Sequence, residues 1–391
     1  MICIEKNNKF LLLKRSKNDI RPNLLEFPGG SVNLGESLEK AAKRELWEET
    51  RLKMNSNLYC GKIERFDRKN NTKTIIHLFL SKDFVGRIKL SKEHSDYVWL
   101  RKRKILKMKP SKEISIDVWN FLKNKNFDIL RKVHTVIIEF SNYCRKNIGR
   151  NIIIMLIGSY SRGEAIPIWS DLDIVVYIPI KGKPLPLKLL KKLREGVLKV
   201  QENIKIPIWL KIHTEKTFFG NLSLDNLLNF YHEGIIVYGK DIKKSLKKYI
   251  KKVREEDLKK MCKNILIKNV YRIRYFYTGI NKNNKEIGSI HLLRRSGNSD
   301  KILAAQIIDK IIEITQYSLL MHGKNIVNRE DAVKTFKQEF KNFPLKNIPL
   351  RMYELRKKWN DLEEREIKFI LNNGPKFSER FLHWLSKNKE V

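Results

Sequence analysis

The sequence predicts two mixed α/β domains followed by an all-α domain, and three observations lead to this prediction. Strand-type and helix-type patterns alternate over residues 1–124, and they alternate again over residues 126–245. From about residue 254 onward, apolar residues recur only at helical spacing. The length of 391 residues also exceeds one ordinary core, since a domain usually holds about 100–200 residues. The expected domains are 1–124, 125–248 and 249–391.

The first domain is expected to open with a hairpin over residues 1–20, because two extended-type runs flank a turn-forming Lys-Asn-Asn-Lys segment. A glycine loop follows at Pro28-Gly29-Gly30. A helix is predicted from Ser37 to about Leu52, where apolar residues recur at helical spacing after a capping serine. The remaining elements are strands near 57–65, 73–80 and 96–100 and a helix near 113–123.

The second domain is expected to begin with an amphipathic helix at residues 126–147, whose apolar residues share one face. A buried strand follows at 152–157 and ends in a glycine turn. The further elements are a strand at 171–178, a helix at 187–202 and strands at 206–213 and 234–238. In the helical remainder, residues 302–321 are the most apolar stretch.

Charge favours an anionic partner without identifying one. The chain has 81 Lys+Arg against 43 Asp+Glu, a formal net charge of +38, which attracts nucleic acid or nucleotide phosphates. Lysine is spread along the whole chain, a pattern that genome composition or a hot habitat also produces. RNA contact is therefore left open. A hydrophobic fraction of 42% excludes an intrinsically disordered chain.

Cysteine usage predicts neither disulfides nor a zinc site. The four cysteines are far apart and form no CxxC or Cys/His pair: Cys3, Cys60, Cys144 and Cys262. The sequence has no secretory signal pattern at its start, and no apolar run approaches the ~20 residues that span a bilayer. We therefore expect a cytoplasmic location and no membrane partner. The oligomeric state stays undetermined.

A cluster of carboxylates marks the first candidate site. Glu45, Glu48 and Glu49 are three and four residues apart, so they project from one face of the predicted helix. An exposed helix with Glu and Lys at i,i+4 spacing is the simpler interpretation. Alternatively, the mutual repulsion of the acids is offset by hard cations such as Mg²⁺ or Mn²⁺. Arg44 could then orient the acids, and Gly29-Gly30 would let the backbone approach phosphate or metal.

The segment from Gly30 to Leu52 resembles the Nudix box, G-x5-E-x7-R-E-U-x-E-E-x-G-U, where U is a bulky apolar residue. It departs from the pattern at one specified position, because Arg51 stands where glycine usually ends the helix. This departure affects a C-cap and not the chemistry. Residues 25–30 and 93–99 also look like Nudix segments. The resemblance covers roughly residues 1–122 and implies a Nudix α/β/α sandwich.

The Nudix resemblance implies that water attacks a phosphoanhydride of a nucleoside diphosphate derivative with the help of a divalent metal. In that family a glutamate of a later loop acts as base or extra ligand, and Glu93 is the matching residue; a solvated loop acid is the alternative. Run 23–30 looks closest to the branch that sanitises nucleoside triphosphates. The implied catalytic residues are Glu48, Glu49 and Glu93, the metal ligands Glu45, Glu48 and Glu49, and the phosphate-binding residues Gly29, Gly30 and Arg44.

A glycine-serine turn and two aspartates mark the second candidate site. Asp171 and Asp173 are two residues apart on a predicted strand, so both face one side and can hold two Mg²⁺ ions. Gly158 and Ser159 are expected at a turn into a helix, where backbone N–H groups bind a triphosphate, with Arg162 close by. An ordinary surface turn capped by Ser170 is the alternative.

Residues 158–173 resemble the G-S…[SD]-D-x-D signature of polymerase-β-type minimal nucleotidyltransferases, and the resemblance covers about 128–245. It implies transfer of NMP from an NTP to a hydroxyl of RNA, a protein or a small molecule. Many members carry a third acid on the strand that matches 207–213, but this strand has Trp209, Lys211 and His213 instead. A nucleotide- or RNA-binding regulator with a decayed centre is therefore the alternative.

The helical remainder pairs basic with aromatic residues at 271–277 and 291–295. Such pairing can bind a single strand by stacking and phosphate contact. At helical spacing these aromatics are more often core residues. By analogy with the same superfamily, a helical domain here would cover the nucleotidyltransferase cleft and select the acceptor.

Overall fold

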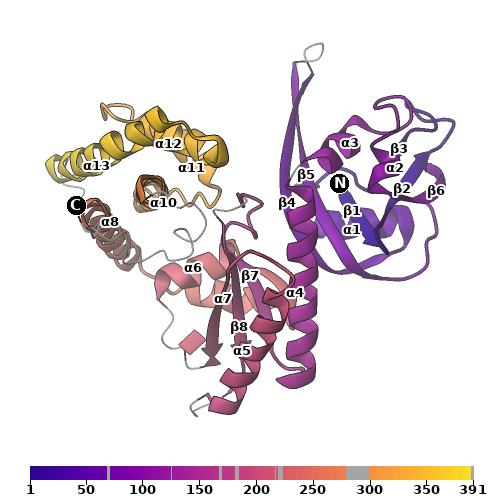
Figure 1. Ribbon diagram of the computed structural model, residues 1–391, viewed down its shortest axis with the longest axis horizontal. Helices are drawn as coiled ribbons and strands as arrows, with labels where there is room; N and C mark the ends of the chain where they lie inside the picture. Colours follow the sequence, from indigo (N-terminus) through magenta and orange to yellow (C-terminus); the bar gives the residue numbers. More distant parts are fainter. Residues whose placement is uncertain are drawn as a thin grey trace. The chain divides into compact units, whose positions relative to one another are not determined.

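The computed structural model describes most of the chain in two compact units (Figure 1). The described residues are 1–67, 71–124, 126–166, 170–180, 185–215, 217–218, 223–278 and 299–388. The first unit holds Met1–Asn221 and Gly234–Asp241, and the second holds Leu222–Glu233 and Ile242–Val391. The first unit is mixed α/β and the second is helical, which confirms the predicted fold classes. The boundaries of the three expected domains stay a prediction.

A six-stranded mixed sheet forms the N-terminal part of the first unit. Its order is β3-β2-β1-β5-β4, and β6 pairs with β2. Strand β1 runs parallel to β5, whereas the other pairs are antiparallel. The strands are β1 (Ile2–Lys6), β2 (Lys9–Arg15), β3 (Leu25–Glu26), β4 (Lys53–Asp67), β5 (Thr72–Val85) and β6 (His94–Arg101).

Alternating apolar residues bury both faces of this sheet. Ile2 and Ile4 of β1 pack with Leu46 of α1 (Leu38–Thr50) on one face. Cys3, between them, packs on the other face with Phe121 of α3 (Ile116–Lys123). Side chains of a strand alternate between faces, so one strand contributes to two cores. The result is the expected α/β/α sandwich.

Some elements of this domain were missed or underestimated from sequence. Strand β3 and the short helix α2 (Lys102–Ile105) have too few residues to show a period. The hairpin of β4 and β5 is longer than the predicted strands. Its register shifts at three places, one of them between Tyr59 and Gly61, and such bulges break the alternation of apolar residues.

A four-stranded sheet, in the order β10-β7-β8-β9, forms the rest of the first unit. Strands β8 and β9 are parallel and the other pairs are antiparallel. Two helices, α4 and α5, pack on each other and share the core of this sheet. The elements are α4 (Phe127–Asn147), β7 (Ile153–Ile157), β8 (Leu172–Ile178), α5 (Leu187–Gln201), β9 (Ile208–Thr214) and β10 (Ile235–Tyr238).

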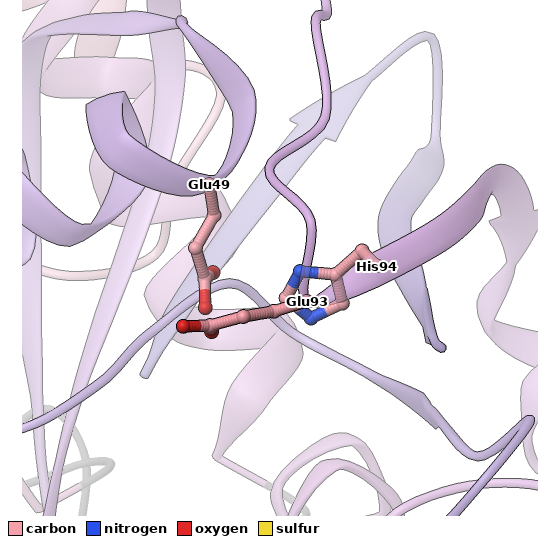
Figure 2. A group of neighbouring side chains, drawn as sticks. All are labelled: Glu49, Glu93 and His94. Atoms are coloured by element: carbon pink, nitrogen blue, oxygen red, sulfur yellow. The ribbon is translucent and has the colours of Figure 1, made fainter. Parts of the chain in front are cut away.

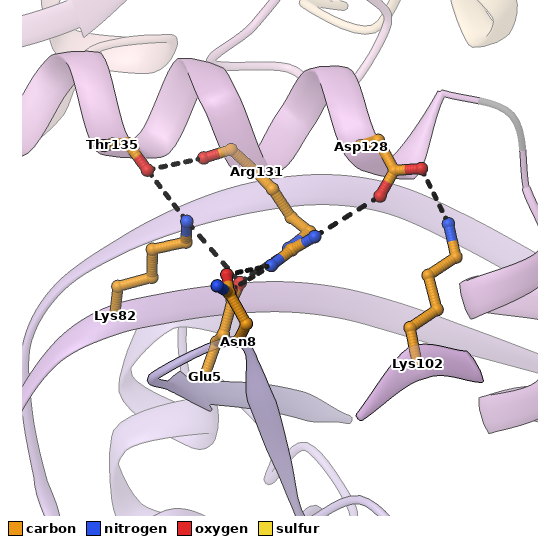
Figure 3. Close-up of polar contacts among 7 residues, drawn as sticks. All are labelled: Glu5, Asn8, Lys82, Lys102, Asp128, Arg131 and Thr135. Atoms are coloured by element: carbon orange, nitrogen blue, oxygen red, sulfur yellow. Dashed lines mark hydrogen bonds and ion pairs between the residues drawn. The ribbon is translucent and has the colours of Figure 1, made fainter. Parts of the chain in front are cut away.

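Helix α4 is anchored to the first sheet by a buried ionic network (Figure 3). Glu5 of β1 is only 3% exposed. Arg131 of α4 donates from Nε to Glu5 Oε2 at 2.8 Å and from Nη2 to the other carboxylate oxygen. Lys82 Nζ lies 3.6 Å from Glu5 Oε2 and donates to Thr135 Oγ1 at 2.8 Å. These contacts join the N-terminal sheet to the first helix of the following domain.

A second contact joins the two sheets at a pair of glycines. Gly61 lies at the bulge of β4, and Gly163 lies in the turn after β7, with φ of +104° and +68°. A Cβ on Gly163 would come within 2.6 Å of the Gly61 nitrogen and 2.9 Å of the Tyr59 ring. Only glycine permits this approach. The turn of the second candidate site therefore rests directly on strand β4.

The second unit is built from helices. Its most buried helix, α10, packs against α8, α11, α12 and α13. Helices α6 and α7 precede residue 254, earlier than predicted. The helices are α6 (Leu224–His232), α7 (Lys243–Ile250), α8 (Glu255–Thr278), α10 (Ser299–Met321), α11 (Arg329–Glu339), α12 (Ile348–Lys357), η2 (Trp359–Asp361) and α13 (Glu364–Lys387).

Other sequence expectations have mixed outcomes. The four cysteines are free, as predicted. In the described parts of the chain, no helix is long and apolar enough to span a bilayer. Tyr271 is 58% exposed and packs against Arg274, so the core interpretation is wrong for this residue. The basic-aromatic segment 291–295, with Arg294 and Arg295, lies outside the described residues.

Candidate active sites

Helix α1 presents the carboxylates of the first site. Ser37 caps its start, accepting a bond from Lys40 N at 3.3 Å. Arg51 ends the helix in the left-handed region, with φ of 59°, and its N–H bonds Trp47 O at 2.9 Å. The arginine thus adopts the left-handed conformation that the usual glycine takes and serves as the C-cap.

Arg44 ties the acids of this helix together. Its guanidinium donates to Glu36 at 2.9 and 3.1 Å, to Glu45 at 2.7 Å and to Glu48 at 3.1 Å. A fifth bond reaches Ser31 O at 2.8 Å and joins the helix to the preceding loop. The Arg44 guanidinium lowers the pKa of the Glu36 carboxyl. Arg44 therefore fixes acids and loop but is fully engaged by them.

The glycine loop lies against two of the carboxylates. Gly29 N donates to Glu49 Oε2 at 2.9 Å. Gly29 has a φ of +150°, and a Cβ there would lie 2.8 Å from Met1 Cα. A Cβ on Gly30 would collide with the Glu45 carboxylate. Gly29 is therefore required by its backbone contact with Met1, Gly30 leaves room for the Glu45 carboxylate, and the Gly29 N–H orients Glu49.

Glu49 is a buried carboxyl that forms no salt bridge with another described residue. It is 7% exposed. Burial raises its pKa to about 7, against the opposing effects of the Gly29 N–H and His94; Glu26 and Glu45 raise it further. A divalent cation with oxygen ligands would supply the missing positive charge. This donor set fits such an ion.

Strand β6 begins directly after Glu93, and the Glu93 side chain lies close to the Glu49 carboxyl (Figure 2). Strand β6 pairs with β2, and Ser16 N donates to Glu93 O at 2.9 Å, which places Glu93 at the sheet end. One ligand atom each from Glu49, Glu93 and His94 lie within 4.8 Å of one another. In Figure 2 the Glu49 and Glu93 carboxylates approach each other, and the His94 ring lies beside Glu93.

His94 was not identified from the sequence as a site residue. A single histidine beside an acid carries no pattern that separates a ligand from a core residue. Its place at the start of β6, next to Glu93, was the available signal. Glu48, in contrast, is half exposed and contacts Arg44, while Glu45 is mostly buried against Gly30.

Two of the hollows in the described part of this domain could hold a small molecule. One, of about 420 Å³, adjoins the helix and the β5 strand and reaches Gly30 and Glu45. Its remaining lining is mostly apolar: Met1, Ile2, Ser31, Val32, Leu38, Ala41, Ala42, Thr74, Ile75, Ile76, His77 and Phe79. The other, of about 410 Å³, is lined by Lys14, Asn23, Leu25, Asp96, Tyr97, Val98, Met108, Lys112 and Glu113. Both volumes lie within the range of small-molecule pockets.

The second site is built on a turn and not on a helix start. Strand β7 ends at Ile157, and the following residues form turns up to Gly163. Gly158 and Gly163 both have positive φ, which closes the chain instead of continuing it as a helix. The expected helix N-terminus at Gly158-Ser159 is therefore wrong. A Cβ on Gly158 would lie 2.6 Å from Asp173 Oδ2, so this turn lies against the aspartate.

The turn is stabilised by its own polar groups. Ser161 Oγ donates to Gly158 O at 2.8 Å, and Glu164 N donates to Ser159 O at 2.9 Å. Arg162 Nε donates to Glu164 Oε2 at 2.9 Å in a nearly buried pair. Arg162, expected beside a nucleotide, is thus held by this carboxylate.

The aspartates lie at the start of β8, between two strands. Asp173 is paired with Ile157 of β7 and with Trp209 of β9, and Asp171 directly precedes the strand. Trp209, 51% exposed, occupies the strand position next to Asp173. Lys211 is paired with Val175, one step further along the same face. Glu215 follows the end of β9.

Within the described residues, no third His, Cys, Asp or Glu ligand groups with these aspartates. The missing acid noted in the sequence is therefore not replaced from another part of the described chain.

Two sequence profiles match the chain. One described as a NUDIX domain matches residues 1–118, and one described as a Nucleotidyltransferase domain matches residues 137–264. An 8-oxo-dGTP diphosphatase from Buchnera aphidicola subsp. Schizaphis graminum is 37% identical over 97 residues, 25% of this chain and 71% of the relative.

Two further similarities concern the same N-terminal region. An ADP-ribose pyrophosphatase from Methanocaldococcus jannaschii is 49% identical over 49 residues, 12% of this chain and only 28% of that protein. The crystal structure of MutT protein from Methanosarcina mazei Go1 has 32% identity and covers 34% of this chain and 91% of that one, with a TM-score of 0.29.

Proposed function

Because this chain belongs to the NUDIX family and carries a nucleotidyltransferase domain behind its NUDIX domain, we propose that it is a bifunctional nucleotide enzyme. The first domain hydrolyses a nucleoside diphosphate derivative. The second transfers NMP from an NTP to a hydroxyl acceptor. The observation that carries the first activity is the buried Glu49 carboxyl, fixed by Gly29 and met by Glu93 from another element.

In the hydrolase site, Glu45, Glu48 and Glu49 would hold Mg²⁺ or Mn²⁺. When bound, this ion supplies charge neutralisation for the diphosphate and acidifies the attacking water. The Gly29 N–H and Arg44 keep the carboxylates in place. Glu93 is exposed, approaches Glu49 from another element and would accept the proton of that water.

The substrate class is supported by the relatives and by the hollow. Proteins named as an ADP-ribose pyrophosphatase and an 8-oxo-dGTP diphosphatase both point to a nucleoside joined to a phosphoanhydride. The hollow of about 420 Å³ offers an apolar lining for the nucleoside and reaches Glu45.

The hydrolase is tested by Glu48→Gln and Glu49→Gln in the full chain. Each is expected to lower Mg²⁺-dependent hydrolysis of a panel containing ADP-ribose, 8-oxo-dGTP and the common dNTPs by at least ~10²-fold. Glu39→Gln is the matched control, because Glu39 lies on the same helix and pairs with the surface residue Lys43. Unchanged hydrolysis in both site variants would contradict the assignment.

The nucleotidyltransferase is supported by the turn that brings Gly158 against Asp173. Asp171 and Asp173 would bind Mg²⁺-NTP, so alanine at either position should abolish NMP transfer and leave hydrolysis intact. Asp257→Ala, in an exposed pair on α8, is the control. Transfer is measured from each of the four NTPs to RNA, protein and aminoglycoside-like acceptors.

Trp209 favours a second candidate function. It stands next to Asp173, where an acid would complete a two-metal site. A domain that binds nucleotide or RNA without turnover would tolerate this tryptophan. Wild-type protein that binds NTP but transfers nothing to any acceptor would favour this binding function for the second domain.

RNA is one proposed acceptor, supported by the net charge of +38. Its affinity should then fall steeply between about 50 and 200 mM salt, and neutralising Arg294 and Arg295 should reduce that slope. Salt-insensitive binding would redirect the search to protein or small-molecule acceptors. The unpaired cysteines support a cytoplasmic location.

A further inference from the structure

The two ring nitrogens of the buried His94 differ in their hydrogen-bond partners. Its side chain is 2% exposed. Nε2 lies 3.4 Å from Glu26 Oε1, and Arg15 Nη1 donates to the other Glu26 oxygen at 3.1 Å. Among the described residues, Nδ1 has no hydrogen-bond partner although it is buried. A buried nitrogen without a partner is costly, so this ring position needs an explanation.

The contact with Glu26 sets the tautomer of the ring. An ionised carboxylate only accepts, so Nε2 carries the proton toward Glu26 and Nδ1 presents a lone pair. This is the arrangement of metal-binding histidines, which donate the second ring N–H to a carboxylate. One carboxylate oxygen each of Glu49 and Glu93 and one ring nitrogen of His94 lie within 4.8 Å of one another, a spacing at which all three could bind the same ion.

We propose that His94 is a nitrogen ligand of a divalent transition-metal ion held between Glu49 and Glu93, and that this domain therefore prefers such ions to Mg²⁺. The inference rests on the proposed hydrolase site, because both carboxylates belong to it. Imidazole binds Co²⁺, Ni²⁺ and Zn²⁺ strongly, whereas Mg²⁺ is held by oxygen ligands. Mn²⁺ accepts both kinds of ligand. Glu26 is the positioning residue that orients the ring.

The experiment uses Co²⁺, Mn²⁺ and Mg²⁺ alone, with no nucleotide. All proteins are full-length and carry Asp173→Ala, which removes the second candidate metal site. Calorimetric titration gives the Kd of each ion, and pulsed electron paramagnetic resonance of bound Mn²⁺ detects coupling to an imidazole ¹⁴N. The parent is expected to show this coupling and to bind Co²⁺ at least ~10-fold more tightly than Mg²⁺.

His94→Gln and His94→Asn separate the ring nitrogens, because their amide oxygens occupy roughly the positions of Nε2 and Nδ1. Both variants should lose the ¹⁴N coupling, and His94→Gln should weaken Co²⁺ binding at least ~10-fold with less than ~3-fold change for Mg²⁺. His94→Asn should retain more Co²⁺ affinity. His322→Gln is the control, since Nδ1 of His322 makes a similar 3.4 Å contact with Glu339.

Absence of ¹⁴N coupling in the folded parent, or an equal loss of Co²⁺ and Mg²⁺ affinity in both variants, would overturn the proposal. Thermal melts identify a variant that fails to fold. In that case the electron paramagnetic resonance spectrum of the parent protein tests the proposal by itself. This result is separable from the hydrolase assignment. If Glu48→Gln loses hydrolysis as expected but the parent shows no ¹⁴N coupling, only the role of His94 as a ligand is contradicted. If the parent shows the coupling but hydrolyses no nucleotide, only the hydrolase activity is contradicted.

Discussion

Arg131→Met is expected to destabilise the first unit by about 2–3 kcal/mol. Breaking a buried ion pair by removing one partner costs about 3–5 kcal/mol, because a buried charge is left behind. Glu5 is the charge in question, at 3% exposure. The cost is reduced because Lys82 stays 3.6 Å away and the Arg131 side chain is itself 19% exposed. Methionine retains apolar contact with the Phe10 and Phe127 rings beneath the arginine.

Scanning calorimetry of the full chain measures this change. A unit of this size loses about 2–4 °C in Tm per kcal/mol, so the transition of the first unit should fall by about 4–12 °C. Arg254→Met removes an exposed pair with Asp257 and should change stability by less than about 0.5 kcal/mol. The double variant Glu5→Gln/Arg131→Met removes the buried carboxylate, while Lys82 keeps its bond to Thr135, and it should recover part of the loss. A single variant within 1 °C of wild type, or a double variant no better than the single, would refute the reasoning.

Three further predictions concern other positions. Trp209→Asp should raise NMP transfer at least ~10-fold by adding an acid next to Asp173, whereas Lys211→Asp, beside Val175, should not; equal gains would contradict the strand register. Burial, aided by the charge of Lys82, lowers the pKa of His134 to about 3. The unfolded state therefore binds more protons than the folded state between pH 6.5 and 3, and the free energy of unfolding decreases toward acid by at most about 1.4 kcal/mol per pH unit. Thermal melts at pH 4 to 8 should show a weaker pH dependence for His134→Leu, and a curve parallel to wild type would contradict this prediction. Gly163→Ala should lower the free energy of unfolding by about 1–3 kcal/mol more than Gly323→Ala, because Gly323 has a similar φ but no neighbouring atoms around its Cβ position. Gly163→Ala should also reduce NMP transfer. Equal Tm values for the two variants would show that the Gly61 contact is not tight.

Sequence reasoning reached the helices and the acids because their signals are local. The cap at Ser37, the spacing of Glu45, Glu48 and Glu49, and the left-handed Arg51 all follow from residues within a few positions of one another. The buried strand β7 and the long helix α4 were similarly marked by apolar periodicity.

The remaining features depend on distant pairing. His94 meets Glu26 across 68 positions of sequence, and Arg131 meets Glu5 across 126. No local pattern reports such contacts. The turn after Gly158 was mistaken for a helix start because Gly163, which reverses the chain, owes its role to Gly61 on another sheet. Trp209 next to Asp173 likewise required the register of two parallel strands.

The anchoring of helix α4 limits how this pair of catalytic modules can be exchanged in evolution. A recombination event near codon 124 would join a sheet that carries a buried Glu5 to a helix without Arg131, or the reverse. Either chimera would contain a buried charged side chain without its ion-pair partner. Module replacement would therefore succeed only when the helix travels with the N-terminal sheet. Among descendants of this fusion, the residues at positions 5 and 131 should change together, while the helical unit varies independently of both.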